Sequence, residues 1–279
     1  MPPAVRKRVL QLVIIAVGAW LAVVVALFLL QRKMVFAAPP AWDVHSTAGV
    51  QHVTIGAGDT EVHALWAEPA EGGPVVVHFH GNAEQLAGQA QMAGLYGRRG
   101  LGFLAVEYPG YGPMSAQEPS EDALIDAGAK AVAWLNERGV PKERIVLQGR
   151  SLGSGVATAL AGRGLGSRLV LLSPFRSLVA VASGHYPWVP VSMLMRDRFD
   201  NERGGRELKI PVLIVHGDVD RIVPYSHGKA LSEVVAGAEL VTVNGAGHND
   251  LLALGGTKVL GKMMSFALQS AATPDAPTD

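Results

Sequence analysis

The stretch IVLQGRSLGSG, residues 145–155, decides the fold. Its first residues are apolar and favour a strand, whereas the small residues after Ser151 favour a tightly packed helix. The pentapeptide GRSLG between them predicts a sharp turn from strand to helix, and such a turn strains the serine backbone and exposes its hydroxyl. Glycines at positions 149 and 153 remove the Cβ atoms that would collide there. Ser151 is therefore the candidate nucleophile.

The pentapeptide alone is a weak signal, because the chain has 33 glycines and a glycine-rich turn can simply pack a helix on a sheet. The wider pattern strengthens it, because strands and helices alternate along most of the chain. This alternation predicts an α/β fold with a mostly parallel central sheet and helices on both faces. The expected strands are 50–55, 61–66, 74–79, 101–107, 144–148, 168–173, 212–216 and 239–243, and the expected helices are 84–99, 118–138, 151–161, 225–235 and 250–269.

A serine hydroxyl needs a base before it can attack a carbonyl carbon. His248 is the candidate base, because its loop GAGHND (245–250) follows an expected strand. Two carboxylates, Asp218 and Asp220, follow the strand 212–216. We expect Asp220 to orient the histidine and Asp218, held in reserve, to shape the turn. All these positions lie where parallel strands end, which is where open sheets of this type place their sites.

Acyl transfer also needs hydrogen-bond donors for the developing oxyanion. One expected donor is the backbone N–H of Leu152, directly after the serine. The other is the backbone N–H of Asn82, in the loop HGNA (80–83) that follows the strand 74–79. His78 and His80 share a strand face and could bind a metal, but no carboxylate or third histidine follows at ligand spacing. We therefore expect no metal, and we expect His80 to hold the loop by hydrogen bonds.

The interval between Ser173 and Ile210 leaves room for a helix and a short cover, so we expect a minimal lid. Tyr111, Phe175 and Trp188 are candidate pocket residues. The apolar side chains of this interval suit the wall of an acyl-chain pocket, and they equally suit ordinary core packing. Glu107, Tyr108 and Tyr111 are expected to support a loop beside the pocket.

The N-terminal segment VLQLVIIAVGAWLAVVVALFLL, residues 9–30, carries no charge and is long enough to span a bilayer. A cleaved signal peptide is the alternative, but its apolar core would be shorter and its cleavage site closer behind. We therefore expect one uncleaved transmembrane helix. Three basic residues and the amino terminus precede it and two basic residues follow, which favours a catalytic domain outside the cytoplasm. The expected organisation is an anchor at 1–33, a linker at 34–49, a catalytic domain at 50–270 and a flexible tail at 271–279.

The composition excludes several classes of function. The 24 basic and 24 acidic side chains cancel, so the sequence gives no support for binding nucleic acid. The absence of cysteine excludes disulfides, thiolate nucleophiles and cysteine-based metal sites. The mean hydropathy of +0.24 arises almost entirely from the anchor segment. Nothing in the sequence specifies an oligomeric state.

Six motifs together resemble the alpha/beta-hydrolase superfamily, most of all its N-terminally membrane-anchored, Bem-type and serine-aminopeptidase-like serine hydrolases. The resemblance covers about residues 50–270. It implies Ser151 as nucleophile, Asp220 as acid and His248 as base, and it places Glu107 where relatives usually carry aspartate. The motifs are HFHGNA (78–83), EYPGYG (107–112), GRSLGSG (149–155), SPF (173–175), HGDVDRIVP (216–224) and GAGHND (245–250).

The sequence thus predicts a membrane-anchored serine hydrolase that cleaves a carboxylic ester or thioester, with an apolar acyl group, and needs no cofactor. The substrate would be a small-molecule or lipid acyl compound. One alternative keeps the same residues and cleaves a peptide with a free amino end, as a serine aminopeptidase does. Another is a non-enzymatic, anchored binding module, although an intact set of serine, aspartate and histidine argues against it.

Overall fold

The computed structural model describes residues 2–40, 44–46 and 48–269, so the expected tail at 271–279 and part of the expected linker lie outside the described residues. It contains an eight-stranded sheet in the order β1-β2-β4-β3-β5-β6-β7-β8. β1 pairs with β2 and β2 with β4 antiparallel, and all other neighbours are parallel, which confirms the predicted fold class. The strands are β1 (Gln51–Ile55), β2 (Val62–Ala67), β3 (Val75–Phe79), β4 (Gly102–Val106), β5 (Ile145–Arg150), β6 (Arg168–Leu172), β7 (Val212–Gly217) and β8 (Glu239–Val243).

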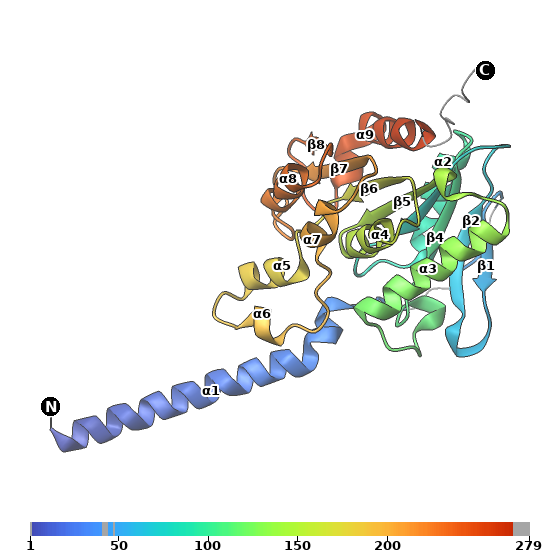
Figure 1. Cartoon of the computed structure of the whole chain (residues 1–279). Coiled ribbons are helices and arrows are strands. Elements are labelled where there is room, and N and C mark those ends of the chain that lie inside the picture. Colours follow the sequence, from blue (N-terminus) through green and yellow to red (C-terminus); the bar gives the residue numbers. More distant parts are fainter. Residues whose placement is uncertain (1, 41–43, 47, 270–279) are drawn as a thin grey trace.

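Helices cover both faces of this sheet (Figure 1). One face packs against α3 (Glu121–Glu137), α4 (Leu152–Gly162) and α8 (Tyr225–Val234), and α7 (Asn201–Arg206) lies against α4 and α8. The other packs against α2 (Ala90–Gly97) and α9 (Leu251–Leu268). The short 3-10 helices are η1 (Gly58–Thr60), η2 (Leu86–Gln89), η3 (Gly112–Met114) and η4 (Lys142–Arg144).

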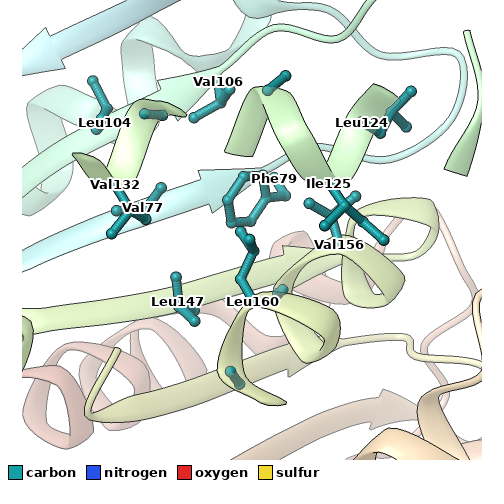
Figure 2. Close-up of a cluster of buried hydrophobic side chains, with 14 of the residues drawn as sticks. Val77, Phe79, Leu104, Val106, Leu124, Ile125, Val132, Leu147, Val156 and Leu160 are labelled. Atoms are coloured by element: carbon teal, nitrogen blue, oxygen red, sulfur yellow. The ribbon is translucent and has the colours of Figure 1, made fainter. Parts of the chain in front are cut away.

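The core on the α3–α4 face holds β5 and α4, the strand and helix on either side of Ser151, in place. Phe79 of β3 lies between α3 and α4, together with Val77, Val156 and Leu160 (Figure 2). Gly128 lets α3 approach closely, since a Cβ there would collide with the Phe79 ring and the Leu160 side chain. Burying a side chain of this size stabilises the fold by roughly 1.5–3 kcal/mol. The turn after β5 therefore stands on a closely packed support.

Between β6 and α7 the chain forms a small cover, the lid, which carries α5 (Leu178–His185) and α6 (Val191–Leu194). Figure 1 shows it beside the sheet, next to the end of α1 that reaches the body. No residue of α5 is buried, so the lid lies over the body and adds little to the core. Its size agrees with the predicted minimal lid.

Helix α1 (Pro3–Val35) contains the predicted apolar segment and extends beyond it at both ends. It projects from the body as a long rod (Figure 1), and residues 2–23 are exposed. Within the described residues, α1 and α9 are the two helices long and apolar enough to cross a membrane. They differ in packing, because α9 covers the sheet with buried Met263 and Val259 whereas the apolar part of α1 is almost entirely exposed.

Candidate active site

Ser151 occupies the sharp turn between β5 and α4 that the sequence predicts. Its backbone has φ 49° and ψ −114°, a conformation that L-residues rarely adopt. The turn is possible because a Cβ at Gly149 would collide with the Gly153 carbonyl, and one at Gly153 would collide with the Phe79 carbonyl. The Ser151 N–H donates to the Leu172 carbonyl at 2.9 Å, which ties the turn to β6.

Ser151, His248 and Asp220 form one continuous hydrogen-bonded chain. Ser151 Oγ lies 2.9 Å from His248 Nε2, and His248 Nδ1 lies 2.7 Å from Asp220 Oδ2. The three residues follow β5, β8 and β7, so the carboxyl ends of these parallel strands bring together residues that are far apart in sequence. His248 and Asp220 are buried, which removes water that would compete for these hydrogen bonds.

The Asp220 carboxylate is held in its ionised form. Burial acts to raise its pKa, but hydrogen bonds from His216 and His248 and from the Val223 N–H outweigh burial and keep the pKa well below its usual value. Its Oδ1 accepts the N–H groups of Ile222 and Val223, both at 2.9 Å. A charge fixed in this way favours the His248 tautomer with its proton on Nδ1.

Asp218, the reserve candidate, lies elsewhere. Its side chain is exposed, and its Oδ1 accepts the Gly245 N–H at 2.7 Å. Asp218 thus shapes the two loops that carry Asp220 and His248, as the sequence predicts.

The predicted oxyanion donors belong to residues that border the same cavity as Ser151. Leu152 is the first residue of α4, where a backbone N–H has no partner within its own helix. Asn82 Oδ1 accepts from Ala83 N at 3.0 Å, from the Tyr111 hydroxyl at 2.8 Å and from Ala37 N at 2.8 Å. These three bonds fix the Asn82 side chain through its oxygen, and the backbone N–H of Asn82 remains the expected second oxyanion donor.

The loop that carries Asn82 rests on a buried polar cluster. Glu107 is fully buried and accepts from His80 Nε2 at 2.8 Å and from the Leu86 N–H at 3.0 Å. The Tyr108 hydroxyl donates to the His80 carbonyl at 2.8 Å. These residues support the loop, in the role expected of Glu107, Tyr108 and His80. The helix predicted at 84–99 begins in the structure as the 3-10 turn η2, and α2 follows it at Ala90–Gly97.

Arg150 supports the loop that carries His248, a role that the sequence did not reveal. Its Nη2 donates to the His248 carbonyl at 3.0 Å, and its guanidinium pairs with Glu84. Burial lowers the pKa of Arg150, and the nearby Asp220 charge opposes that change. Arg150, the second residue of the pentapeptide, thus holds the loop that carries His248.

A cavity of about 300 Å³ opens from Ser151 and is walled almost entirely by apolar side chains. Phe175 borders it, as predicted, but Tyr111 and Trp188 do not. Tyr111 is fully buried behind Asn82, and the Trp188 side chain is 47% exposed to solvent. The bordering residues are Val24, Leu27, Phe28, Gln31, Met34, Val35, Asn82, Ser151, Leu152, Phe175, Leu178, Val181, Ala182, His185, Tyr186, Val189, Val191, Leu194, Met195 and Val223.

Six of these bordering residues belong to α1, and sequence reasoning missed all of them. The apolar segment is uniformly hydrophobic, so nothing in its pattern distinguishes a face that lines a cavity from a face in lipid. The one available signal was Gln31, a polar residue that terminates the apolar segment immediately before two basic ones.

Comparisons with known proteins support the same fold. A sequence model of the family described as "TAP-like protein" matches residues 191–277. The chain is 34% identical over 278 residues to the uncharacterized protein Rv2307c of Mycobacterium tuberculosis, covering 95% of this chain and 98% of that protein.

Two further matches carry descriptive names. An alpha/beta hydrolase domain-containing protein 17B of Xenopus laevis is 31% identical over 192 residues, covering 68% of this chain and 65% of that protein. A solved Mycobacterium tuberculosis puromycin-hydrolyzing peptidase superposes with a TM-score of 0.66 at 17% identity, over 81% of this chain and 40% of the peptidase. With these matches and the observed sheet order, the chain belongs to the alpha/beta-hydrolase superfamily.

Proposed function

We propose that this protein is a serine hydrolase that cleaves a carboxylic ester or thioester with an apolar acyl group. The observation that carries the proposal is the hydrogen-bonded chain from Asp220 through His248 to Ser151, whose last residue, Ser151, borders an apolar cavity. An aligned nucleophile, base and carboxylate are the parts that acyl transfer needs.

The reaction follows from these positions. His248 Nε2 takes the Ser151 proton as Oγ attacks the acyl carbonyl carbon, and Asp220 stabilises the imidazolium through Nδ1–H. The backbone N–H groups of Leu152 and Asn82 donate to the oxyanion. The alcohol or thiol leaves with the proton from His248. A water then attacks the acyl carbon as His248 takes its proton, the bond to Ser151 Oγ breaks, and that proton returns to Oγ as the acid leaves.

The lining of the cavity favours an ester or thioester over a peptide with a free amino end. A peptide ammonium group would need a carboxylate partner. Among the described residues that border the cavity, none is aspartate or glutamate. His185, the one imidazole among them, points its Nε2 at the Ile222 carbonyl at 3.0 Å.

We further propose that α1 anchors the protein in a membrane, with the catalytic domain outside the cytoplasm. The support is the uncharged stretch of 22 residues at 9–30 and the larger number of positive charges on its N-terminal side. Cysteine substitutions at Ser46 and Ser115, labelled with an impermeant maleimide in intact cells, test the orientation. Labelling only after the cells are lysed would show that the catalytic domain lies in the cytoplasm.

The nucleophile is tested with a fluorophosphonate probe on the full chain in detergent. We expect wild type and Ser115→Ala, which changes an exposed serine, to be labelled equally, and Ser151→Ala to lose labelling. A ladder of acyl 4-nitrophenyl esters should show turnover that rises with chain length, by up to about fourfold for each added methylene that is buried. Unchanged labelling of Ser151→Ala, or faster turnover of aminoacyl amides than of esters, would overturn the proposal.

A further inference from the structure

The last third of α1 docks on the catalytic domain, unlike the rest of the helix. Burial begins abruptly at Val24, after 22 consecutive exposed residues. From there the residues that are buried or half-buried recur every three or four positions, so they form one face of the helix. They are Val24, Leu27, Phe28, Gln31, Arg32 and Val35.

Polar contacts fix this face against the lid. Gln31 Nε2 donates to the Leu194 carbonyl at 3.3 Å, and Gln31 Oε1 accepts the Arg196 N–H at 2.9 Å. Arg32 Nε pairs with the nearly buried Asp197 at 3.1 Å. Because these bonds have defined directions, they hold the helix at one rotation, with the same face always toward the cavity.

The length of the helix places this contact at the depth of a membrane. A bilayer has a hydrocarbon core of roughly 30 Å. The exposed uncharged residues 9–23 cover only about 22 Å at 1.5 Å per residue. The remaining thickness falls on residues 24–30, among which Val24, Leu27 and Phe28 border the cavity. A membrane that covers the uncharged segment therefore reaches the cavity wall.

The lid exposes apolar side chains beside this part of α1. Met193 is 84% exposed and Trp188 is 47% exposed, although both are large and apolar. The Trp20 indole N–H donates to the Trp188 carbonyl at 3.2 Å, so this edge of the lid lies against the exposed part of the helix. Such an edge suits lipid better than water.

We infer that α1 is both the anchor and one wall of the substrate pocket, and that the pocket receives the acyl chain of a lipid directly from the bilayer that α1 spans. This inference rests on the proposed ester hydrolysis at Ser151. The acyl chain would lie between α1 and α5, with its carbonyl carbon at Ser151 Oγ.

Matched substitutions on two faces of α1 test the wall. Leu27 borders the cavity, whereas Leu29 is 71% exposed and does not. The measured quantity is the ratio of kcat/KM for myristoyl and butyryl 4-nitrophenyl esters, with the full chain in nanodiscs. Filling the cavity with Leu27→Trp should lower this ratio about tenfold or more, since each methylene excluded from an apolar site costs about fourfold. Leu29→Trp should leave the ratio at its wild-type value.

A smaller side chain at position 27 should change the acyl-chain preference in the opposite direction. Leu27→Ala enlarges the cavity and should shift the preferred acyl chain to a longer one, which guards against a misfolded tryptophan variant. Equal ratios in Leu27→Trp, Leu27→Ala and wild type would overturn the proposal that α1 forms a wall of the pocket. If the wild-type protein hydrolyses none of the esters, the proposed function is wrong. This outcome is distinct from equal ratios among active variants.

The origin of the acyl chain is tested by where the substrate is placed. A fluorogenic myristoyl glycerolipid is put either in the same phosphatidylcholine nanodisc as the enzyme or in separate nanodiscs. We expect at least about tenfold faster hydrolysis in the shared nanodisc, because each buried methylene stabilises an acyl chain in its bilayer and so slows its transfer to another nanodisc. Leu27→Trp should lose this advantage. Equal rates in both arrangements would show that the chain arrives from solution and would overturn the membrane route.

Discussion

The two sides of the cavity are built in different ways. On the sheet side, Ser151, Asp220 and His248 sit on loops that follow strands, and buried hydrogen bonds fix each of them. On the opposite side, α1 and the lid are partly exposed and are joined by a small number of polar contacts at Gln31 and Arg32. On the proposed function, the sheet side would fix where bonds are broken, while the helical side would determine what shape of molecule can reach that point.

This division gives a rule for substitutions. A change on the sheet side should affect every substrate alike, because it acts on the reacting atoms. A change on the helical side should act on long acyl chains above all, because on the proposed arrangement only these extend along α1. The following expectations test the rule, in order of decreasing effect.

Removing the charge beside His248 should have the largest effect. Asp220→Asn should lower kcat for all esters by about a thousandfold or more, because the amide no longer favours the imidazole tautomer that accepts the serine proton. Steady-state kinetics on the ester ladder measures this. Asp218→Asn is the matched control and should stay within a few fold of wild type, since an asparagine oxygen can still accept the Gly245 N–H. Similar losses in both variants would contradict the assignment of Asp220.

Acid should destabilise the sheet side through His78. Burial lowers the pKa of His78 to about 3 from 6.5, so the unfolded chain binds a proton that the folded chain does not bind. Stability is therefore complete above pH 6.5 and falls as the pH decreases toward 3, by at most about 1.4 kcal/mol per pH unit for one proton. Chemical unfolding at several pH values measures the slope. His78→Gln, which retains a polar group near Gln148, should flatten it, and an unchanged slope would exclude His78 as the cause.

Loosening the helical side should give a smaller and selective effect. Arg32→Ala leaves the buried Asp197 carboxylate without its cation, at a cost of about 1–3 kcal/mol in helix docking. We expect KM for myristoyl esters to rise about tenfold or less while fluorophosphonate labelling of Ser151 continues. Lys33→Ala removes an exposed neighbouring charge and serves as the control. A KM that rises equally for butyryl esters would contradict the division between the two sides.

The smallest effect is expected at Tyr111. Tyr111→Phe removes the hydroxyl bond to Asn82 Oδ1, which is worth about 1 kcal/mol, or roughly a fivefold change. Because this bond holds the oxyanion loop, kcat should fall by up to that factor for short and long esters alike. A decrease in kcat confined to long esters would contradict this role and would indicate that Tyr111 contacts the acyl chain.

The strands could be predicted because parallel strands buried on both faces appear in the sequence as short apolar runs, and β3 and β7 are clear examples. The candidate positions Ser151 and Asp220 followed, since each lies just after such a run. His248 follows the edge strand β8, which is mostly not buried, so its loop GAGHND was the signal. Side-chain direction could not be predicted in the same way. Trp188 belongs to the lid but points outward, and Tyr111 lies near the cavity but behind Asn82.

The role of α1 was beyond sequence reasoning for a different reason. A helix in lipid and a helix against an apolar cavity need the same side chains, so Leu27 and Leu29 look alike in the sequence. Only the fold distinguishes them, by bringing residues 194–197 of the lid beside the end of the helix.

If the acyl chain enters from the bilayer as proposed, the contact between α1 and the cavity also determines the substrate concentration at the active site. On the proposed arrangement, the active site meets its substrate in two dimensions, at the mole fraction of that lipid in the surrounding bilayer. Diluting a suspension of membranes leaves this mole fraction unchanged, so the rate per enzyme would stay constant. Mixing an inert lipid into the same bilayer would lower the rate in proportion, even though the amount of substrate in the tube is unaltered.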